Sequence, residues 1–199
     1  MSESERAKWD DVHRGKPIGT AEPFLVEMIS RIPRSGLALD VAAGRGRNAL
    51  AMARAEIRVV AVDFSETAMR TVADAARAEH LLVWPVVANL DSFHLKHKSL
   101  DAIVNINFLD RALFAEFSRA LRPGGVLIAE TFTNEQASLG HPKDPRFLLG
   151  HGELKELAAG LEIEHYREGL VSYRYGTRAF RASVVARKGS QSEMTRKSS

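Results

Sequence analysis

Residues 37–50 read Leu-Ala-Leu-Asp-Val-Ala-Ala-Gly-Arg-Gly-Arg-Asn-Ala-Leu, and they indicate the fold class. The apolar run 37–41 predicts a buried strand, the small residues 42–46 predict a tight turn, and a helical pattern follows at once. A second apolar run, Val59 to Val62, ends in Asp63 about twenty residues later. Small residues let a ligand approach the backbone, and the acid can accept hydrogen bonds from ribose hydroxyls. The stretch therefore predicts a nucleotide-type site after the first strand.

The rest of the chain alternates between strand and helix patterns. We expect strands at 37–42, 58–63, 82–87, 100–106, 126–132, 161–166 and 177–187, and helices at 22–32, 47–55, 66–76, 108–121 and 153–159. The last strand alternates apolar and polar residues, which is typical of an antiparallel strand with one wetter face. The pattern predicts an α/β fold: a Rossmann-like, doubly wound, mainly parallel seven-stranded sheet with an antiparallel last strand and helices on both faces. Such sheets bind ligands at the carboxyl ends of their strands.

Composition narrows the class of protein. The 199 residues include no cysteine, which excludes disulfides, thiol nucleophiles and cysteine-ligated metal clusters. The first ten residues lack a signal-peptide core, and no apolar stretch could span a bilayer. These features predict a cytoplasmic protein with no membrane partner. The net charge of +3 comes from residues 187–199, so the body is neutral and a nucleic-acid partner is not expected.

Three parts are expected along the chain. Residues 1–21 form an N-terminal lid segment, residues 22–187 the folded domain, and residues 188–199 a disordered basic tail. The polar stretch 133–149 is long for a connection, which suggests a functional loop. The histidines of this region, His141 and His151, and the neighbouring Arg146 are candidates for substrate contacts, although exposed loop residues of these types usually bind no ligand.

With these features in place, the chain resembles the class I S-adenosylmethionine (SAM)-dependent methyltransferases. Within this class it resembles the small single-domain branch that includes the tellurite-resistance and thiopurine-type enzymes. The resemblance covers about residues 5–187 and rests on five stretches at strand ends and turns: 39–48, 61–65, 88–91, 107–111 and 121–125. One departure is Ala42, which stands where the wider family has the first glycine of its turn.

The resemblance implies SAM as the cofactor and a set of cofactor-binding residues. Asp40 would order the turn or accept from the ligand's ammonium, Asp63 would hold the ribose hydroxyls, and Phe64 would offer an apolar face to adenine. The full predicted set is Trp9, Asp40, Ala42, Ala43, Gly44, Gly46, Asn48, Asp63, Phe64, Ser65, Asn89, Leu90, Asp91 and Asn105. No catalytic residue and no metal ligand are predicted.

Each of these residues also has a purely structural interpretation. Glycines after a strand are often only turn residues, and an aspartate at a strand end often caps a helix. Ser65 is a good N-cap for the helix that follows it. Trp9 is either a lid over the cofactor or a surface packing residue.

The expected activity is methyl transfer from SAM to a small-molecule acceptor, such as a thiol or a chalcogen oxyanion, because a soft nucleophile needs little general base. Three alternatives remain open: a non-catalytic SAM-binding module, an RNA or protein methyltransferase that docks through the basic tail, and an NAD-dependent oxidoreductase. The last is disfavoured because Asp40 puts a negative charge beside the turn that would hold a pyrophosphate.

Overall fold

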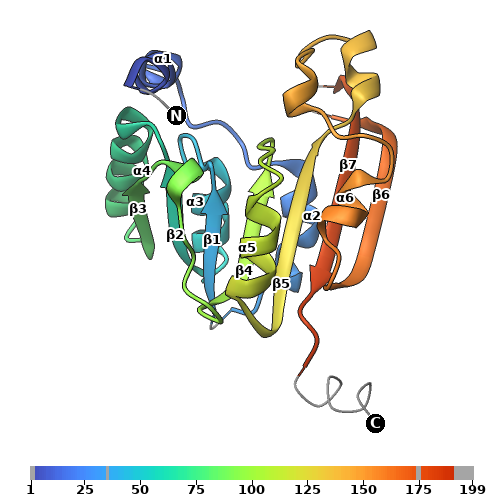
Figure 1. The fold of residues 1–199 in the computed structure, drawn as a ribbon. Coiled ribbons are helices and arrows are strands. Elements are labelled where there is room, and N and C mark those ends of the chain that lie inside the picture. Colours follow the sequence, from blue (N-terminus) through green and yellow to red (C-terminus); the bar gives the residue numbers. More distant parts are fainter. Residues whose placement is uncertain (1–2, 35, 174–175, 191–199) are drawn as a thin grey trace. The chain divides into compact units, whose positions relative to one another are not determined.

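A computed structural model describes residues 3–34, 36–173 and 176–190 (Figure 1). The predicted disordered tail lies outside the described residues from residue 191 onward. The chain divides into two compact units, Met1–His94 and Leu95–Ser199.

Unit 1 is built on three parallel strands. They are β1 (Leu37–Val41), β2 (Arg58–Asp63) and β3 (Val83–Val87), in the order β3-β2-β1. Their apolar residues are largely buried on β1 and β2, as the continuous apolar runs predict. Val41 lies opposite Val62 in the parallel register, so the carboxyl ends of β1 and β2 lie together. This pairing brings the turn after β1 next to Asp63.

The helices α3 (Arg47–Arg54) and α4 (Glu66–Ala78) pack on β2 and β3. Ser65 caps α4 as predicted, because its hydroxyl accepts a hydrogen bond from the Ala68 N–H at 3.1 Å. The helix expected at 22–32 is α2 (Pro23–Met28) followed by a 3-10 turn, Ile29–Arg31. A second 3-10 turn, Leu90–Ser92, follows β3.

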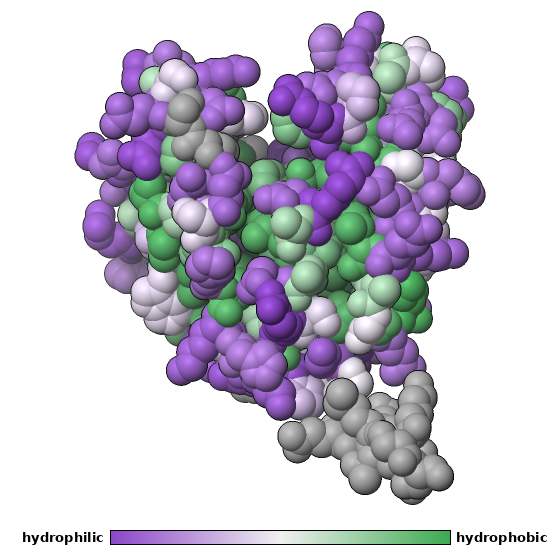
Figure 2. Space-filling view, viewed as in Figure 1, coloured by the Kyte–Doolittle hydropathy of each residue, from purple (hydrophilic) through white to green (hydrophobic). Residues whose placement is uncertain are grey.

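Unit 1 begins with a helix that the sequence did not predict, α1 (Glu3–His13). None of its residues is buried, and its surface is mostly hydrophilic (Figure 2). Without an apolar stripe, the periodicity that identifies a helix is absent. The helix packs against α4 and is held there by polar contacts.

Unit 2 contains four strands in the order β4-β5-β7-β6. They are β4 (Leu100–Ile106), β5 (Leu121–Phe132), β6 (Glu162–Ser172) and β7 (Arg178–Arg187). β4 and β5 are parallel, and β7 is antiparallel to both of its neighbours. Helix α5 (Leu113–Ala120) packs on β5, and helix α6 (Glu153–Leu157) packs on β7. The predicted antiparallel last strand is confirmed.

Three elements have a boundary that differs from the prediction by about five residues, and the other differences are smaller. Helix α5 begins at Leu113 rather than 108, because Asn107 has a positive φ of 63° and the Asp110 side chain accepts from the Ala112 N–H instead of continuing a helix. Strand β5 includes the predicted turn 122–125 as an irregularity, since its pairing with β4 jumps between Leu100 and Ala102. Strand β6 continues to Ser172 because it pairs with β7 up to Arg178.

The predicted α/β class is confirmed, with seven mainly parallel strands in the described residues, flanking helices and an antiparallel last strand. The loop 133–149 contains two 3-10 turns, Asn134–Ser138 and Pro145–Phe147. Among the described residues, no helix combines the length and the apolar character that crossing a membrane requires.

Candidate functional site

The turn after β1 has an unusual backbone. Ala42, Gly44 and Gly46 have φ values of 51°, 53° and 79°, in the left-handed region that glycine adopts without a Cβ penalty. Ala43 ties the turn to β2, because its N–H donates to the Val62 carbonyl at 2.9 Å. The turn therefore presents backbone rather than side chains at the end of β1.

Gly46 also has a packing role. A Cβ built on Gly46 would lie 2.5 Å from Val72 Cγ2 on α4, closer than real Cβ atoms approach. At Gly44 a Cβ would make an ordinary contact of 3.4 Å with His13 Cε1. The two glycines thus differ: Gly46 lets α3 and α4 approach, whereas the space beside Gly44 is bounded by the ring of His13.

Asp63, at the end of β2, holds this turn. Its Oδ2 accepts from the Gly44 N–H at 2.8 Å and its Oδ1 from the Ser65 N–H at 2.9 Å. A carboxylate offers about four lone-pair positions, so these two bonds leave acceptor capacity on both oxygens. The residue is 9% exposed and therefore not fully covered. The carboxylate is fixed by backbone donors and can still accept hydrogen bonds from a ligand.

Asp40 is the second acid of the turn and is buried on β1. Burial raises its pKa to about 7, against the lowering effects of the Ala49 N–H and the Arg47 cation. Its Oδ2 has no hydrogen-bond partner in the part of the chain that the structure describes. A buried acceptor without a partner is costly, so this oxygen suits a donor supplied by a ligand, such as an ammonium group.

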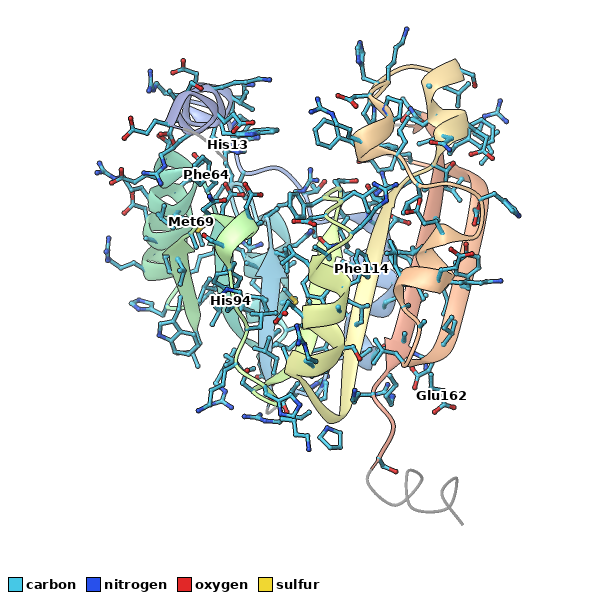
Figure 3. The ribbon with its side chains drawn as sticks, in the orientation of Figure 1. His13, Phe64, Met69, His94, Phe114 and Glu162 are labelled. Carbon is cyan, nitrogen blue, oxygen red and sulfur yellow. The ribbon has the colours of Figure 1, made fainter. Side chains whose placement is uncertain are left out.

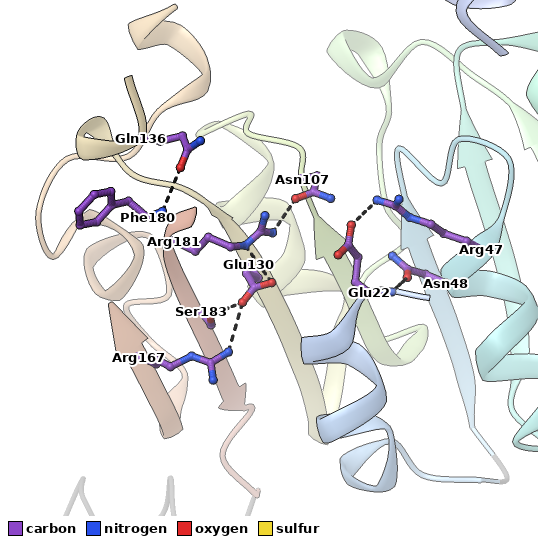
Figure 4. A network of polar contacts seen from close by, with 10 residues as sticks. All are labelled: Glu22, Arg47, Asn48, Asn107, Glu130, Gln136, Arg167, Phe180, Arg181 and Ser183. Carbon is purple, nitrogen blue, oxygen red and sulfur yellow. Dashed lines mark hydrogen bonds and ion pairs between the residues drawn. The ribbon is translucent and has the colours of Figure 1, made fainter. Parts of the chain in front are cut away.

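Asn48 and Arg47, at the start of α3, bind Glu22 (Figure 4). Arg47 Nη2 donates to Glu22 Oε1, and the Glu22 N–H donates to Asn48 Oδ1 at 3.0 Å. The Glu22 side chain is completely buried. Asn48 Oδ1 therefore already accepts a hydrogen bond from the protein's own backbone. Glu22 was not among the predicted site residues, since a single acid before a helix carries no distinguishing pattern.

Helix α1 reaches the same region through Asp10. Asp10 Oδ1 accepts from the Ser65 hydroxyl at 2.5 Å and from the Thr67 N–H at 3.0 Å, so it caps the start of α4 together with Ser65. The Ser65 hydrogen bond is the main cause that lowers the pKa of Asp10. The Ser65 hydroxyl thus donates to Asp10 of α1 and accepts from the Ala68 N–H of α4. Asp10 was not among the predicted site residues, because no local pattern marks it.

His13, at the end of α1, lies beside the turn, since a Cβ on Gly44 would lie 3.4 Å from its Cε1. Its ring stacks on Trp9 with centroids 6.0 Å apart, and its Nδ1 is 3.3 Å from Arg45 Nη1. Burial lowers the pKa of His13, and the nearby charge of Asp63 opposes this effect. Trp9 itself is 44% exposed. Figure 3 shows His13 and Phe64 at the same end of unit 1.

The remaining predicted residues of unit 1 surround Asp63. The guanidinium of Arg6 lies 4.6 Å from the centre of the Phe64 ring, so α1 also covers this ring. Asn89 Oδ1 accepts from the Asp91 N–H at 3.1 Å, and Leu90 between them is buried. The side chain of Asn89 therefore caps a turn.

Unit 2 contains the predicted site residue Asn105 and the two candidate histidines of the long loop. Asn105 on β4 is buried, and its Oδ1 has no hydrogen-bond partner among the described residues. The two loop histidines have different contacts. His151 Nδ1 lies 2.8 Å from Glu168 Oε1. The backbone carbonyl of His141 accepts a hydrogen bond from Gln136 Nε2 at 3.1 Å within the loop. Within residues 3–34, 36–173 and 176–190, no group of three or more His, Asp or Glu side chains could hold a metal ion.

Comparison with known proteins agrees with this geometry. A family model described as a methyltransferase domain matches residues 38–125, slightly less than half of the chain and including the turn, Asp40 and Asp63. No curated protein matches the chain by sequence.

Solved structures match over more of the chain. One, described by the conversion of a disulfide bond into a thioacetal group during echinomycin biosynthesis, is 22% identical, covers 97% of each chain and has a TM-score of 0.73. A SAM-dependent methyltransferase from Methanosarcina mazei is 20% identical over 87% of this chain and 100% of its own, with a TM-score of 0.68. TehB from Haemophilus influenzae is 19% identical over 83% of this chain and 61% of its own, with a TM-score of 0.69.

At these identities the solved structures show the fold, and the family model shows the domain. Residues 38–125 match the methyltransferase-domain model, which agrees with the predictions of a methyltransferase and of SAM as its cofactor. The individual cofactor contacts stay predictions, as does the similarity to the tellurite-resistance branch in particular.

Proposed function

We propose that this protein transfers a methyl group from SAM to a small-molecule acceptor and holds the cofactor in the turn of unit 1. The observation that carries the proposal is the Asp63 carboxylate, which is fixed by the Gly44 and Ser65 N–H groups and keeps acceptor positions on both oxygens. Two ribose hydroxyls are donors of the number and spacing that such a carboxylate can bind.

The neighbouring residues fit the other parts of the cofactor. Asp40 Oδ2, buried and without a partner in the described residues, suits the ammonium of the methionine moiety. The left-handed turn from Ala42 to Gly44 offers bare backbone beside it. Phe64 and the buried Leu90 are apolar groups for the adenine ring. When bound, SAM supplies a methyl group already activated by its sulfonium.

The chain's own contribution to such a transfer is binding, orientation and exclusion of water. Helix α1 supports the last role, because Arg6 lies over Phe64 and His13 lies beside Gly44. We propose that residues 1–21 act as a lid whose contact with the turn is made by His13, with Trp9 stacked behind it.

For the acceptor, we propose a thiol or a chalcogen oxyanion. Soft nucleophiles attack carbon readily without prior removal of a proton, so they fit a site for which no general base has been assigned. The similarity to the structure described by a disulfide-to-thioacetal conversion supports sulfur as the attacking atom.

Calorimetric titration with S-adenosylhomocysteine tests the cofactor site. We expect Asp63→Ala to weaken binding by about 1–3 kcal/mol, the usual value of charge-assisted hydrogen bonds. Asp74→Ala is the matched control, because Asp74 is an exposed acid of α4 paired with Arg77. Since Asp63 also holds the turn, thermal unfolding of each variant is measured alongside. Unchanged affinity in folded Asp63→Ala would show that the ribose binds elsewhere.

Turnover is tested separately, by following S-adenosylhomocysteine formation with a panel of thiols, tellurite and selenite. Product with any of these supports the acceptor class. Cofactor binding without turnover across a broad acceptor panel would favour the non-catalytic SAM-binding alternative.

A further inference from the structure

Unit 2 contains a buried arginine that the cofactor site does not use. Arg181 lies on β7 and is 0% exposed. The strand pattern predicted a polar residue on its wetter face, yet the structure buries the whole side chain. An arginine keeps its charge in such a place, so its five N–H groups all need acceptors.

Part of the guanidinium is satisfied within the protein (Figure 4). Its Nε lies 3.0 Å from Glu130 Oε1, and its Nη2 donates to Asn107 Oδ1 at 2.5 Å. Its central carbon lies 4.4 Å from the centre of the Phe132 ring and 4.7 Å from that of the Tyr173 ring. The cation is thus enclosed by one acid, one amide and two aromatic rings.

The hydrogen bonding of this guanidinium is incomplete. Arg181 Nη1 is buried and has no hydrogen-bond partner among the described residues, and Nε, which lies in the ion pair with Glu130, forms no hydrogen bond there either. Glu130 is shared between two arginines. Its Oε2 accepts from the Ser183 hydroxyl and lies 3.5 Å from Arg167 Nη2, so its negative charge does not compensate Arg181 exclusively. The two N–H groups of Nη1 therefore remain without an acceptor, and the positive charge of Arg181 is only partly compensated. Both effects cost free energy in a buried place.

We propose that Arg181 Nη1 anchors a binding site in unit 2 for a small aromatic molecule that carries a carboxylate. A carboxylate is planar, accepts from adjacent N–H groups of a guanidinium and brings the missing negative charge. The same arginine already binds the carboxylate of Glu130 through Nε. Phe132 and Tyr173 provide aromatic surface next to the guanidinium, which suits a ring attached to that carboxylate.

In this proposal, Tyr173 controls access to the buried guanidinium. Tyr173, the residue after β6, is only half-buried, and its N–H donates to the Thr177 carbonyl at 2.7 Å. Rotation of its side chain would uncover Arg181 while this backbone hydrogen bond stays in place. On the other side, Gln136 holds the loop 133–149 to β7, because its Oε1 accepts from the Phe180 N–H at 2.9 Å. The long loop singled out from the sequence therefore borders the same cluster.

This site goes beyond methyl transfer, since it is formed by residues of unit 2 and should bind the aromatic carboxylate in the absence of a cofactor. The test uses the full chain without SAM, and its failure is distinct from a failure of S-adenosylhomocysteine binding. Benzoate is the probe, benzyl alcohol is its neutral counterpart, and inorganic sulfate tests whether any anion suffices.

We expect saturable benzoate binding by calorimetry, with a shift of one arginine guanidinium signal in nitrogen-detected NMR, and no saturable binding of benzyl alcohol. Arg181→Lys keeps a positive charge but lacks Nη1, so benzoate should bind at least about tenfold more weakly. Arg178→Lys is the matched control, because Arg178 is exposed on the same strand, and its benzoate affinity should not change.

Removal of a buried charge can prevent folding, so a second variant accompanies the first. The double variant Glu130→Gln/Arg181→Met removes both charges together and avoids an uncompensated one. It should lose benzoate binding and still bind S-adenosylhomocysteine. Unchanged benzoate affinity in either variant, sulfate binding as tight as benzoate binding, or no saturable benzoate binding by the natural protein up to about 10 mM would overturn the proposal.

Discussion

Cofactor binding should be linked to the ionisation of Asp40. Burial raises the pKa of this acid to about 7, so near neutral pH it is partly protonated in the free protein. If the ammonium of the cofactor lies against Asp40 Oδ2, it favours the ionised form, and binding then releases a proton. The perturbation is a change of pH across the neutral range, and the ligand is S-adenosylhomocysteine.

The size of the effect follows from the pKa. An acid with a pKa of about 7 is roughly nine-tenths protonated at pH 6 and roughly one-tenth protonated at pH 8. If only the ionised form binds, affinity is greatest above pH 7 and falls as the pH drops through 7. The loss between pH 8 and pH 6 is about tenfold, which corresponds to about 1.4 kcal/mol.

Calorimetry at pH 6, 7 and 8, in buffers of different ionisation enthalpy, measures both the affinity and the protons released. Asp40→Asn is the key variant, because it keeps the shape of the side chain and removes its titration. His13 is the other nearby group that titrates, and burial lowers its pKa from the ordinary 6.5. The variant His13→Gln removes this titration and so distinguishes its effect from that of Asp40. A tenfold fall in affinity that persists in Asp40→Asn would refute the assignment of Asp40 to the ammonium.

Two further predictions concern the scaffold of the site. Gly46→Ala should destabilise the protein by about 1–3 kcal/mol in thermal or denaturant unfolding, since its Cβ would overlap Val72. Adding Val72→Ala should cost less than the sum of the two single changes, and strict additivity would contradict the packing role. Asp10→Ala should loosen α1 at a cost of about 1 kcal/mol, the usual value of a helix cap, and should speed limited proteolysis near residues 14–16. Asp11→Ala, on the same helix but outside this cap, is the control, and equal proteolysis of the two variants would show that the cap does not hold the lid.

Much of the fold could be predicted because its signals are local. The apolar runs of β1 and β2, the small residues between β1 and α3, and the cap at Ser65 act over a few neighbouring residues. Their spacing therefore appears directly in the sequence. The same holds for Asp40 and Asp63, whose positions at strand ends place them at the ligand edge of a parallel sheet.

The sequence by itself thus determined the α/β class, the turn after the first strand and the two acids beside it. Only the tertiary structure decided which polar side chains meet. Asp10 lies 55 residues from Ser65, Glu22 lies 26 from Asn48, and Arg181 lies 74 from Asn107. In the sequence these residues look like ordinary solvated groups. Their burial and their partners depend on chain segments that come together only when the strands pair and the helices pack, and no local pattern records such contacts.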